Sequence, residues 1–194
     1  DPKSLWKDIE SYKNDSYWKE DNVAIASDFL DKKIVIASKR GRSHANVGSF
    51  RDDDFALKNI NDTGWSVLAV SDGAGSASLS RQGSKLSCDL VLSYFEATFT
   101  AEYLKEFDEN LLNHHNKTDE DSSKKISNFV SDNLSKAAWF VHKELEKFSV
   151  QLERPLKDLH ATLIFALVKK YDFGYAILTF GVGDCPIGLL NKDL

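Results

Sequence analysis

Apolar residues recur at helical spacing in two stretches of the chain. The clearest pattern covers residues 126–148, where apolar side chains fall three or four positions apart, and this spacing predicts a long amphipathic helix. The pattern ends before Arg154-Pro155, as expected because the residue that precedes a proline disfavours the helical conformation. The same spacing predicts a second helix from about Ser80 to Phe99.

Short runs rich in β-branched and aromatic residues predict strands. These runs cover residues 34–38, 65–71, 161–168 and 175–182, with a shorter candidate at 55–57 and the start of another at 187–190. A turn at residues 169–174 joins two of the long runs, which is typical of an antiparallel hairpin. The order of strands, two helices and strands again favours an α+β layered domain over a regularly alternating βαβ fold.

We expect residues 1–30 to form an N-terminal helical extension, because four apolar residues near its start have helical spacing. They are Leu5, Trp6, Ile9 and Tyr12. Residues 31–194 are expected to form the main domain. Since the sequence ends just as a predicted strand begins, we expect this domain to be truncated at its C-terminus.

Composition narrows the classes of protein that this sequence fits. The chain has 194 residues, 42% of them hydrophobic and 28% charged, which fits one globular domain. Its net charge of −5 argues against nucleic acid or an anionic membrane as partner, because both need clustered lysine and arginine. No apolar run approaches the roughly 20 residues of a membrane-spanning helix. Two isolated cysteines without metal or disulfide spacing fit a reducing, cytoplasmic setting.

Two acidic segments beside predicted strands carry the candidate chemistry. In Asp52-Asp53-Asp54, three adjacent carboxylates repel one another, and a divalent cation would relieve that repulsion; a solvated acidic turn is the alternative. Asp72 closes the run 65–71, and Gly73 and Gly75 behind it allow close approach of an ion or phosphate. A capped glycine-rich turn is the alternative there. Together the two segments suit a pair of cations that activate water and clamp a phosphoryl group.

The glycine-rich segment also resembles, in part, a dinucleotide-binding fingerprint. Gly73 and Gly75 follow a predicted strand and precede a predicted helix, but the third glycine position holds Ser78. The following elements do not alternate as a βαβ unit requires. A nucleotide-binding α/β enzyme is therefore the weakest of the alternatives.

Five segments occur in an order that resembles the metal-dependent protein phosphatases of type 2C, and within them the bacterial members with G-x-S-H and D-G-A-G-S segments. They are Gly41-Arg42-Ser43-His44, Asp52-Asp53, Val70-Ser71-Asp72-Gly73-Ala74-Gly75-Ser76, Ala161-Thr162-Leu163 and Gly181-Val182-Gly183-Asp184. The resemblance spans about residues 34–190. It implies a four-layer αββα sandwich, in which helices flank two antiparallel sheets.

The resemblance also implies a centre of two Mn²⁺ or Mg²⁺ ions at one end of the sandwich. Asp72 would bridge both ions, and the carbonyl of Gly73 would bind one of them. Asp53 matches the acid of the first motif, with Asp52 as the acidic residue before it. Asp184 matches a turn that supports the site. Asp72 and Asp53 are therefore the implied catalytic residues.

The sequence departs from the family pattern at several points. The candidates for the phosphate-binding arginine of the family are Arg40, Arg42 and Arg51, and none aligns cleanly. We expect Arg42 to take that role together with His44. Ala74 stands where many eukaryotic members have a histidine that acts as a general acid. The further metal-binding aspartates that the family supplies from later motifs do not lie in this sequence.

The resemblance implies hydrolysis of phosphoserine and phosphothreonine in proteins by water activated at the metals, with no covalent intermediate. The implied partners are a phosphorylated protein substrate and an opposing serine/threonine kinase. The alternative is a phosphatase-like module that binds phosphorylated partners with weak or no hydrolysis.

Overall fold

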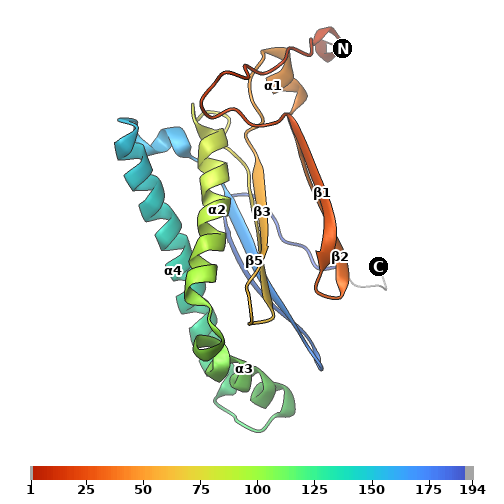
Figure 1. The fold of residues 1–194 in the computed structure, drawn as a ribbon, viewed down its shortest axis with the longest axis vertical. Coiled ribbons are helices and arrows are strands. Elements are labelled where there is room, and N and C mark those ends of the chain that lie inside the picture. The colour runs from red at the N-terminus through yellow and green to blue at the C-terminus, as the bar shows by residue number, and fades with distance from the viewer. Residues whose placement is uncertain (1, 191–194) are drawn as a thin grey trace.

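The computed structural model describes residues 2–190 of the chain, and Figure 1 shows their arrangement. The elements follow one another as η1 (Pro2–Leu5), β1 (Asn22–Phe29), β2 (Lys32–Lys39), α1 (Arg42–Asn46), β3 (Asp54–Asn59), β4 (Trp65–Ser71), α2 (Ser80–Thr98), α3 (Ala101–Asn116), α4 (Ser122–Gln151), η2 (Leu156–Leu159), β5 (Leu163–Tyr171) and β6 (Gly174–Val182).

The sheets are antiparallel throughout. One has four strands in the order β3-β4-β5-β6, and the other is the hairpin β1-β2. In the larger sheet, Asp54 pairs with Ser71 and Leu163 pairs with Val182. Since Val70 pairs with Ile164 across β4 and β5, the first or last residue of every strand in this sheet lies at one common end. This register decides where the candidate site forms.

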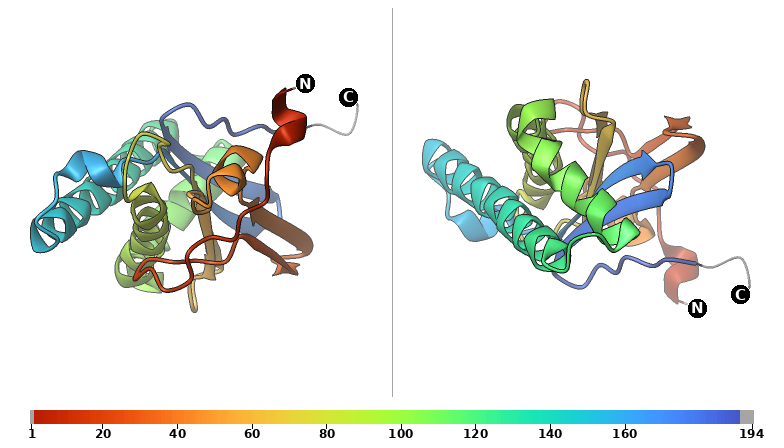
Figure 2. Two further views of the ribbon diagram at one scale, coloured as in Figure 1. Left: turned by 90° about the horizontal axis from the view of Figure 1, so that it is seen from above. Right: turned by 90° about the horizontal axis from the view of Figure 1, so that it is seen from below.

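Helices α2 and α4 cover one face of the four-stranded sheet, and the β1-β2 hairpin lies on the other side (Figures 1 and 2). The core between helices and sheet is rich in aromatic rings, which bury the largest apolar areas of any side chains. Trp65, Phe95, Phe99 and Phe165 are each at most 2% exposed. Phe95 meets Phe99 edge to face with ring centroids 4.9 Å apart.

The α+β class with antiparallel sheets packed against helices is confirmed. Both expected helices form, as α2 and α4. Helix α3 was not expected; Thr100 caps its N-terminus by accepting a hydrogen bond from the backbone N–H of Tyr103 at 3.1 Å. No helix within residues 2–190 combines the length and apolar character needed to cross a membrane.

The expected N-terminal helical extension is wrong as a structure. Beyond the short η1, the segment has no helix, and Asn22–Phe29 is strand β1. The apolar spacing was misleading because Leu5 and Tyr12 remain 81% and 65% exposed, so no apolar surface packs against that face. The backbone bonds elsewhere instead, as when Ile9 N–H donates to the carbonyl of Ala45 at 2.9 Å. The strand expected to start at residue 187 is also not formed within the described residues.

Gly83 provides a test of how α2 meets the segment before β5. A Cβ atom built at Gly83 would lie 1.9 Å from the carbonyl oxygen of Leu159, which is backbone and cannot turn away. We predict that Gly83→Ala lowers the free energy of unfolding by about 2–3 kcal/mol, as overpacking does, measured by urea denaturation. Gly75→Ala is the control, because a Cβ there meets no atom within 4 Å. Equal stability of the two variants would contradict this packing.

Candidate metal centre

The site forms where two loops meet at the common end of the four-stranded sheet. The acidic loop, residues 51–53, leads into β3, and the glycine loop, residues 72–76, follows β4. Because Asp54 and Ser71 are paired in the register of these strands, Asp53 and Asp72 are neighbours across them. The sheet thus brings together two of the acids that the sequence singles out.

The strand register places the carboxyl groups of Asp53 and Asp72 near one another. The hydrogen bond to Asp53 is the largest cause that raises the pKa of Asp72, to about 6, and partial burial and the negative charges of Asp53 and Asp184 add to it. Adjacent carboxylates favour the protonated form because their charges repel. A cation placed between them would remove this repulsion, so the pair suits metal binding.

Gly73 allows the two loops to touch. A Cβ atom at this position would lie 2.7 Å from the carbonyl oxygen of Asp52 and 2.9 Å from its Cβ. Any larger residue would push the acidic loop away from the glycine loop. The absence of a side chain at Gly73 therefore sets the spacing of the site.

Thr162 fixes the glycine loop to the sheet. Its hydroxyl accepts a hydrogen bond from the backbone N–H of Asp72 at 2.9 Å, and its own N–H donates to the carbonyl of Asp72 at 2.8 Å. The same hydroxyl lies 3.1 Å from the sulfur of Cys185, in the turn that carries Asp184. Sequence reasoning assigned Thr162 no role, although it is the polar residue in an otherwise apolar run.

Asp52 has different neighbours from Asp53. Its carboxylate lies 3.5 Å from Nδ1 of His44 and interacts with the Ser80 hydroxyl, while burial raises its pKa. His44 also donates from Nδ1 to the carbonyl of Phe50 at 2.8 Å. Of the two adjacent candidates, the structure therefore places Asp53 beside Asp72 and places Asp52 beside His44.

A hollow of 470 Å³ opens next to Asp52 and His44. The polar groups around it include Ser76 of the glycine loop, Ser78 just after that loop, and the guanidinium of Arg81. The Arg81 guanidinium lies 4.0 Å from the centre of the Phe50 ring. This hollow is large enough for a phosphorylated side chain.

The arginines near the site have separate roles. Arg51, 4% exposed at its side chain, donates to the carbonyl of Glu20 at 2.8 Å and to the Ser38 hydroxyl at 2.9 Å. Its partners make it a structural residue. Arg42 is exposed and donates to the carbonyl of Lys3 at 3.2 Å, so it lies at the surface rather than against Asp53 or Asp72.

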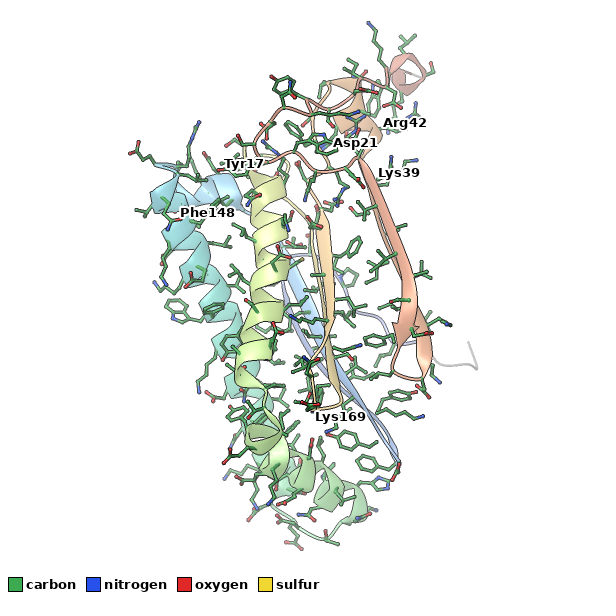
Figure 3. All side chains as sticks on the ribbon, in the orientation of Figure 1. Tyr17, Asp21, Lys39, Arg42, Phe148 and Lys169 are labelled. Atoms are coloured by element: carbon green, nitrogen blue, oxygen red, sulfur yellow. The ribbon has the colours of Figure 1, made fainter. Side chains whose placement is uncertain are left out.

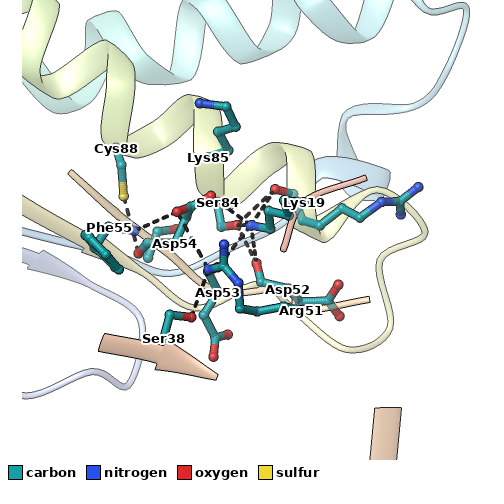
Figure 4. A network of polar contacts seen from close by, with 12 residues as sticks. Lys19, Ser38, Arg51, Asp52, Asp53, Asp54, Phe55, Ser84, Lys85 and Cys88 are labelled. Atoms are coloured by element: carbon teal, nitrogen blue, oxygen red, sulfur yellow. Dashed lines mark hydrogen bonds and ion pairs between the residues drawn. The ribbon is translucent and has the colours of Figure 1, made fainter. Parts of the chain in front are cut away.

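The largely buried side chain of Lys19 contacts the backbone of the acidic loop and the carboxylate of Asp54 (Figure 4). The ammonium of Lys19 forms an ion pair with Asp54 at 2.9 Å and donates a hydrogen bond to the carbonyl of Asp53 at 3.0 Å. Burial lowers the pKa of Lys19, and the hydrogen bond to Asp54 opposes that shift. Nothing in the sequence pattern distinguished Lys19 from other lysines.

The donor set fits a divalent cation in part. Asp53 and Asp72 supply two neighbouring carboxylates, and oxygen ligands are those that Mg²⁺ and Mn²⁺ prefer. Within residues 2–190, however, no group of three or more histidine, cysteine or acidic side chains is arranged to hold an ion. Asp184 acts on Asp72 through its charge, not as a third member of such a group.

Comparison with protein families decides the relationship of this chain. The family model described as protein phosphatase 2C matches residues 40–193, most of the chain. The chain belongs to the protein phosphatase 2C family. Comparisons with curated proteins and with solved structures give no match.

Membership of the protein phosphatase 2C family implies serine/threonine protein phosphatase function and phosphoprotein substrates, and the family is generally metal-dependent. The match covers both loops of the candidate centre and the strands that carry them. It begins after residue 39, so Lys19 lies outside it.

The Asp53–Asp72 pair predicts an unusual effect of Asp72→Asn on stability. A carboxyl whose pKa rises from 3.8 to about 6 on folding binds its proton more tightly in the folded state. The free energy of unfolding therefore falls as the pH rises from about 4 to 6 and stays low above that. In the presence of chelator at pH 7.5, we expect Asp72→Asn to raise Tm by roughly 1–3 °C, and this gain should vanish near pH 4.

Millimolar Mn²⁺ should raise the Tm of the wild-type chain more than that of Asp72→Asn. The wild-type chain should gain Tm because the ion binds only the folded state, and Asp72→Asn should lose most of that gain. Asp62→Asn, in the turn between β3 and β4, is the control and should respond like wild type. An Asp72→Asn protein that Mn²⁺ stabilises as strongly as wild type would contradict a metal centre at this pair.

Proposed function

We propose that this chain is a Mn²⁺- or Mg²⁺-dependent phosphatase that hydrolyses phosphoserine and phosphothreonine in proteins. The observation that carries the proposal is the register of β3 and β4, which pairs Asp54 with Ser71 and so places Asp53 and Asp72 side by side. Two like charges held together at the end of a sheet are costly without a cation. Family membership supports the reaction class.

Asp72 and Asp53 are the residues that would hold two ions, with the carbonyl of Gly73 and the carboxylate of Asp52 as further ligands. When bound, such ions activate a water molecule for attack on phosphorus and neutralise the phosphoryl oxygens. By holding the ions at the end of the sheet, Asp72 and Asp53 would orient the attack. Thr162 holds Asp72 in place through both of its backbone hydrogen bonds, and Asp184 supports the site from the neighbouring turn.

Arg42 and His44 are proposed to contact the phosphate. The bond from Arg42 to the carbonyl of Lys3 is exposed, and a phosphate would replace it with a charge-assisted pair. His44 lines the hollow beside Asp52, where an imidazole N–H suits a phosphoryl oxygen. Since Ala74 carries no acidic proton, water would protonate the leaving group.

The finer features of the fold and setting are also part of this proposal. We expect the helix layer, the four-stranded sheet and the hairpin to belong to a four-layer αββα sandwich. The proposed partners are phosphorylated proteins in the cytoplasm and a serine/threonine kinase that opposes the reaction. Neither nucleic acid nor a membrane is proposed as a partner.

A phosphatase-like module that binds phosphorylated partners without hydrolysis is the second candidate. One observation favours it: within residues 2–190, no three histidine, cysteine or acidic side chains are grouped so that they could hold a metal ion. This candidate keeps the hollow beside His44 as a binding site and removes the need for two ions.

Hydrolysis assays distinguish the two candidates. The full chain should release phosphate from p-nitrophenyl phosphate and from a phosphothreonine peptide in Mn²⁺, and chelator should stop the reaction. We expect Asp72→Asn to lower kcat at least about 100-fold, because a proposed metal ligand is lost, while Asp62→Asn keeps full activity. A folded wild-type chain that binds the phosphopeptide and releases no phosphate would support the binding module instead.

A further inference from the structure

We propose that Lys19 is a positioning residue for the acidic loop, which holds the backbone of Asp52 and Asp53 so that their carboxylates stay available to cations. The inference rests on the proposed metal centre. It goes beyond that centre because Lys19 lies outside the segment that matches the family and bears no carboxylate or other ligand.

The ammonium of Lys19 joins the two sides of the site. It donates to the Asp53 carbonyl at 3.0 Å and lies 3.5 Å from the Asp52 carbonyl, both in the acidic loop. It also donates to the Arg81 carbonyl at 3.0 Å and lies 3.2 Å from the Ser84 hydroxyl, both in the first turns of α2. Helix α2 begins soon after the glycine loop, so Lys19 ties the acidic loop to the element that follows Asp72.

Lys19 contacts different atoms of the three adjacent aspartates, Asp52, Asp53 and Asp54. Lys19 contacts the backbone carbonyls of Asp52 and Asp53, and the only carboxylate to which it donates is that of Asp54, at 2.9 Å. Asp54 is thereby neutralised inside the protein. The carboxylate of Asp53 is left to meet Asp72. A side chain that bound all three carboxylates would instead compete with an ion.

Burial makes these contacts strong and fixed in geometry. The Lys19 side chain is 11% exposed, and a buried ammonium is stable only when its N–H groups are satisfied. Its three shortest contacts, to Asp54, Asp53 and Arg81, match its three N–H donors. Ser84 adds a second link, since its hydroxyl also donates to the Asp52 carbonyl.

The backbone around Lys19 is anchored on both sides. Asp15 forms an ion pair with Arg81 at 2.9 Å, and the ring of Tyr17 packs edge to face on Phe148 of α4 at 6.3 Å (Figure 3). Beyond Lys19, the carbonyl of Glu20 accepts from Arg51 at 2.8 Å. Residues 15–20 are therefore a fixed part of the site wall, and Lys19 reaches the loop from a rigid base.

Lys19→Met tests the proposal, because methionine has similar length and no charge or donor. Mn²⁺ affinity is measured by electron paramagnetic resonance of the free ion, and the Mn²⁺ concentration for half-maximal hydrolysis is measured with p-nitrophenyl phosphate. We expect Lys19→Met to weaken Mn²⁺ binding about tenfold or more, as loss of a group that orients ligands does. At saturating Mn²⁺, kcat should recover much of its wild-type value. Lys13→Met, at an exposed lysine, is the matched control.

The outcomes separate this inference from the proposed function. A wild-type chain that binds Mn²⁺ without hydrolysis would end the phosphatase proposal, and the change in affinity of Lys19→Met would still decide the role of Lys19. Unchanged Mn²⁺ affinity in a folded Lys19→Met protein would overturn the inference, as would a wild-type chain that binds no Mn²⁺. If Lys19→Met does not fold, Ser84→Ala decides: a two- to threefold weaker affinity supports the positioning role, and an unchanged one overturns it.

Discussion

The close approach of Gly73 to the carbonyl of Asp52 is the constraint on which the rest of the site depends. It brings the acidic loop against the glycine loop, and only a residue without a side chain permits it. The register of β3 and β4 then determines that Asp53, and not Asp52, is the residue that faces Asp72. A backbone contact thus selects which carboxylate of three adjacent aspartates joins the pair.

This geometry has an electrostatic cost that the protein offsets from one side only. Behind the acidic loop, Lys19 and Arg51 are buried and bound to its backbone carbonyls, and Lys19 neutralises Asp54. On the open side, the hydrogen bond to Asp53, partial burial and the negative charge of Asp53 raise the pKa of Asp72 to about 6. The acids that are neutralised internally and the acids left for an ion are therefore different members of one sequence run.

The sequence was sufficient to predict two of the helices and most of the strands, but not the contacts that organise them. Periodicity located α2 and α4 because their apolar faces pack on the sheet, and alternation of loops and apolar runs located β4, β5 and β6. The same reasoning failed for residues 5–12, where apolar spacing exists without a surface to bury it. It also missed Lys19 and Thr162, because their partners lie far away in the sequence, and no local pattern records a long-range hydrogen bond.

Lys19 lies outside the segment that matches the family. It matters to the proposed metal centre because it holds the backbone of the acidic loop. A carboxylate whose oxygens bind an ion has to be positioned through other atoms of the same residue. In this protein Lys19 contacts the backbone carbonyls of Asp52 and Asp53. The anchor has to be cationic, since it also meets Asp54, and it has to come from a segment fixed independently of the loop. Residues 15–20 meet both requirements through the ion pair of Asp15 with Arg81 and the packing of Tyr17 on Phe148. The N-terminal segment is for this reason part of the site's wall.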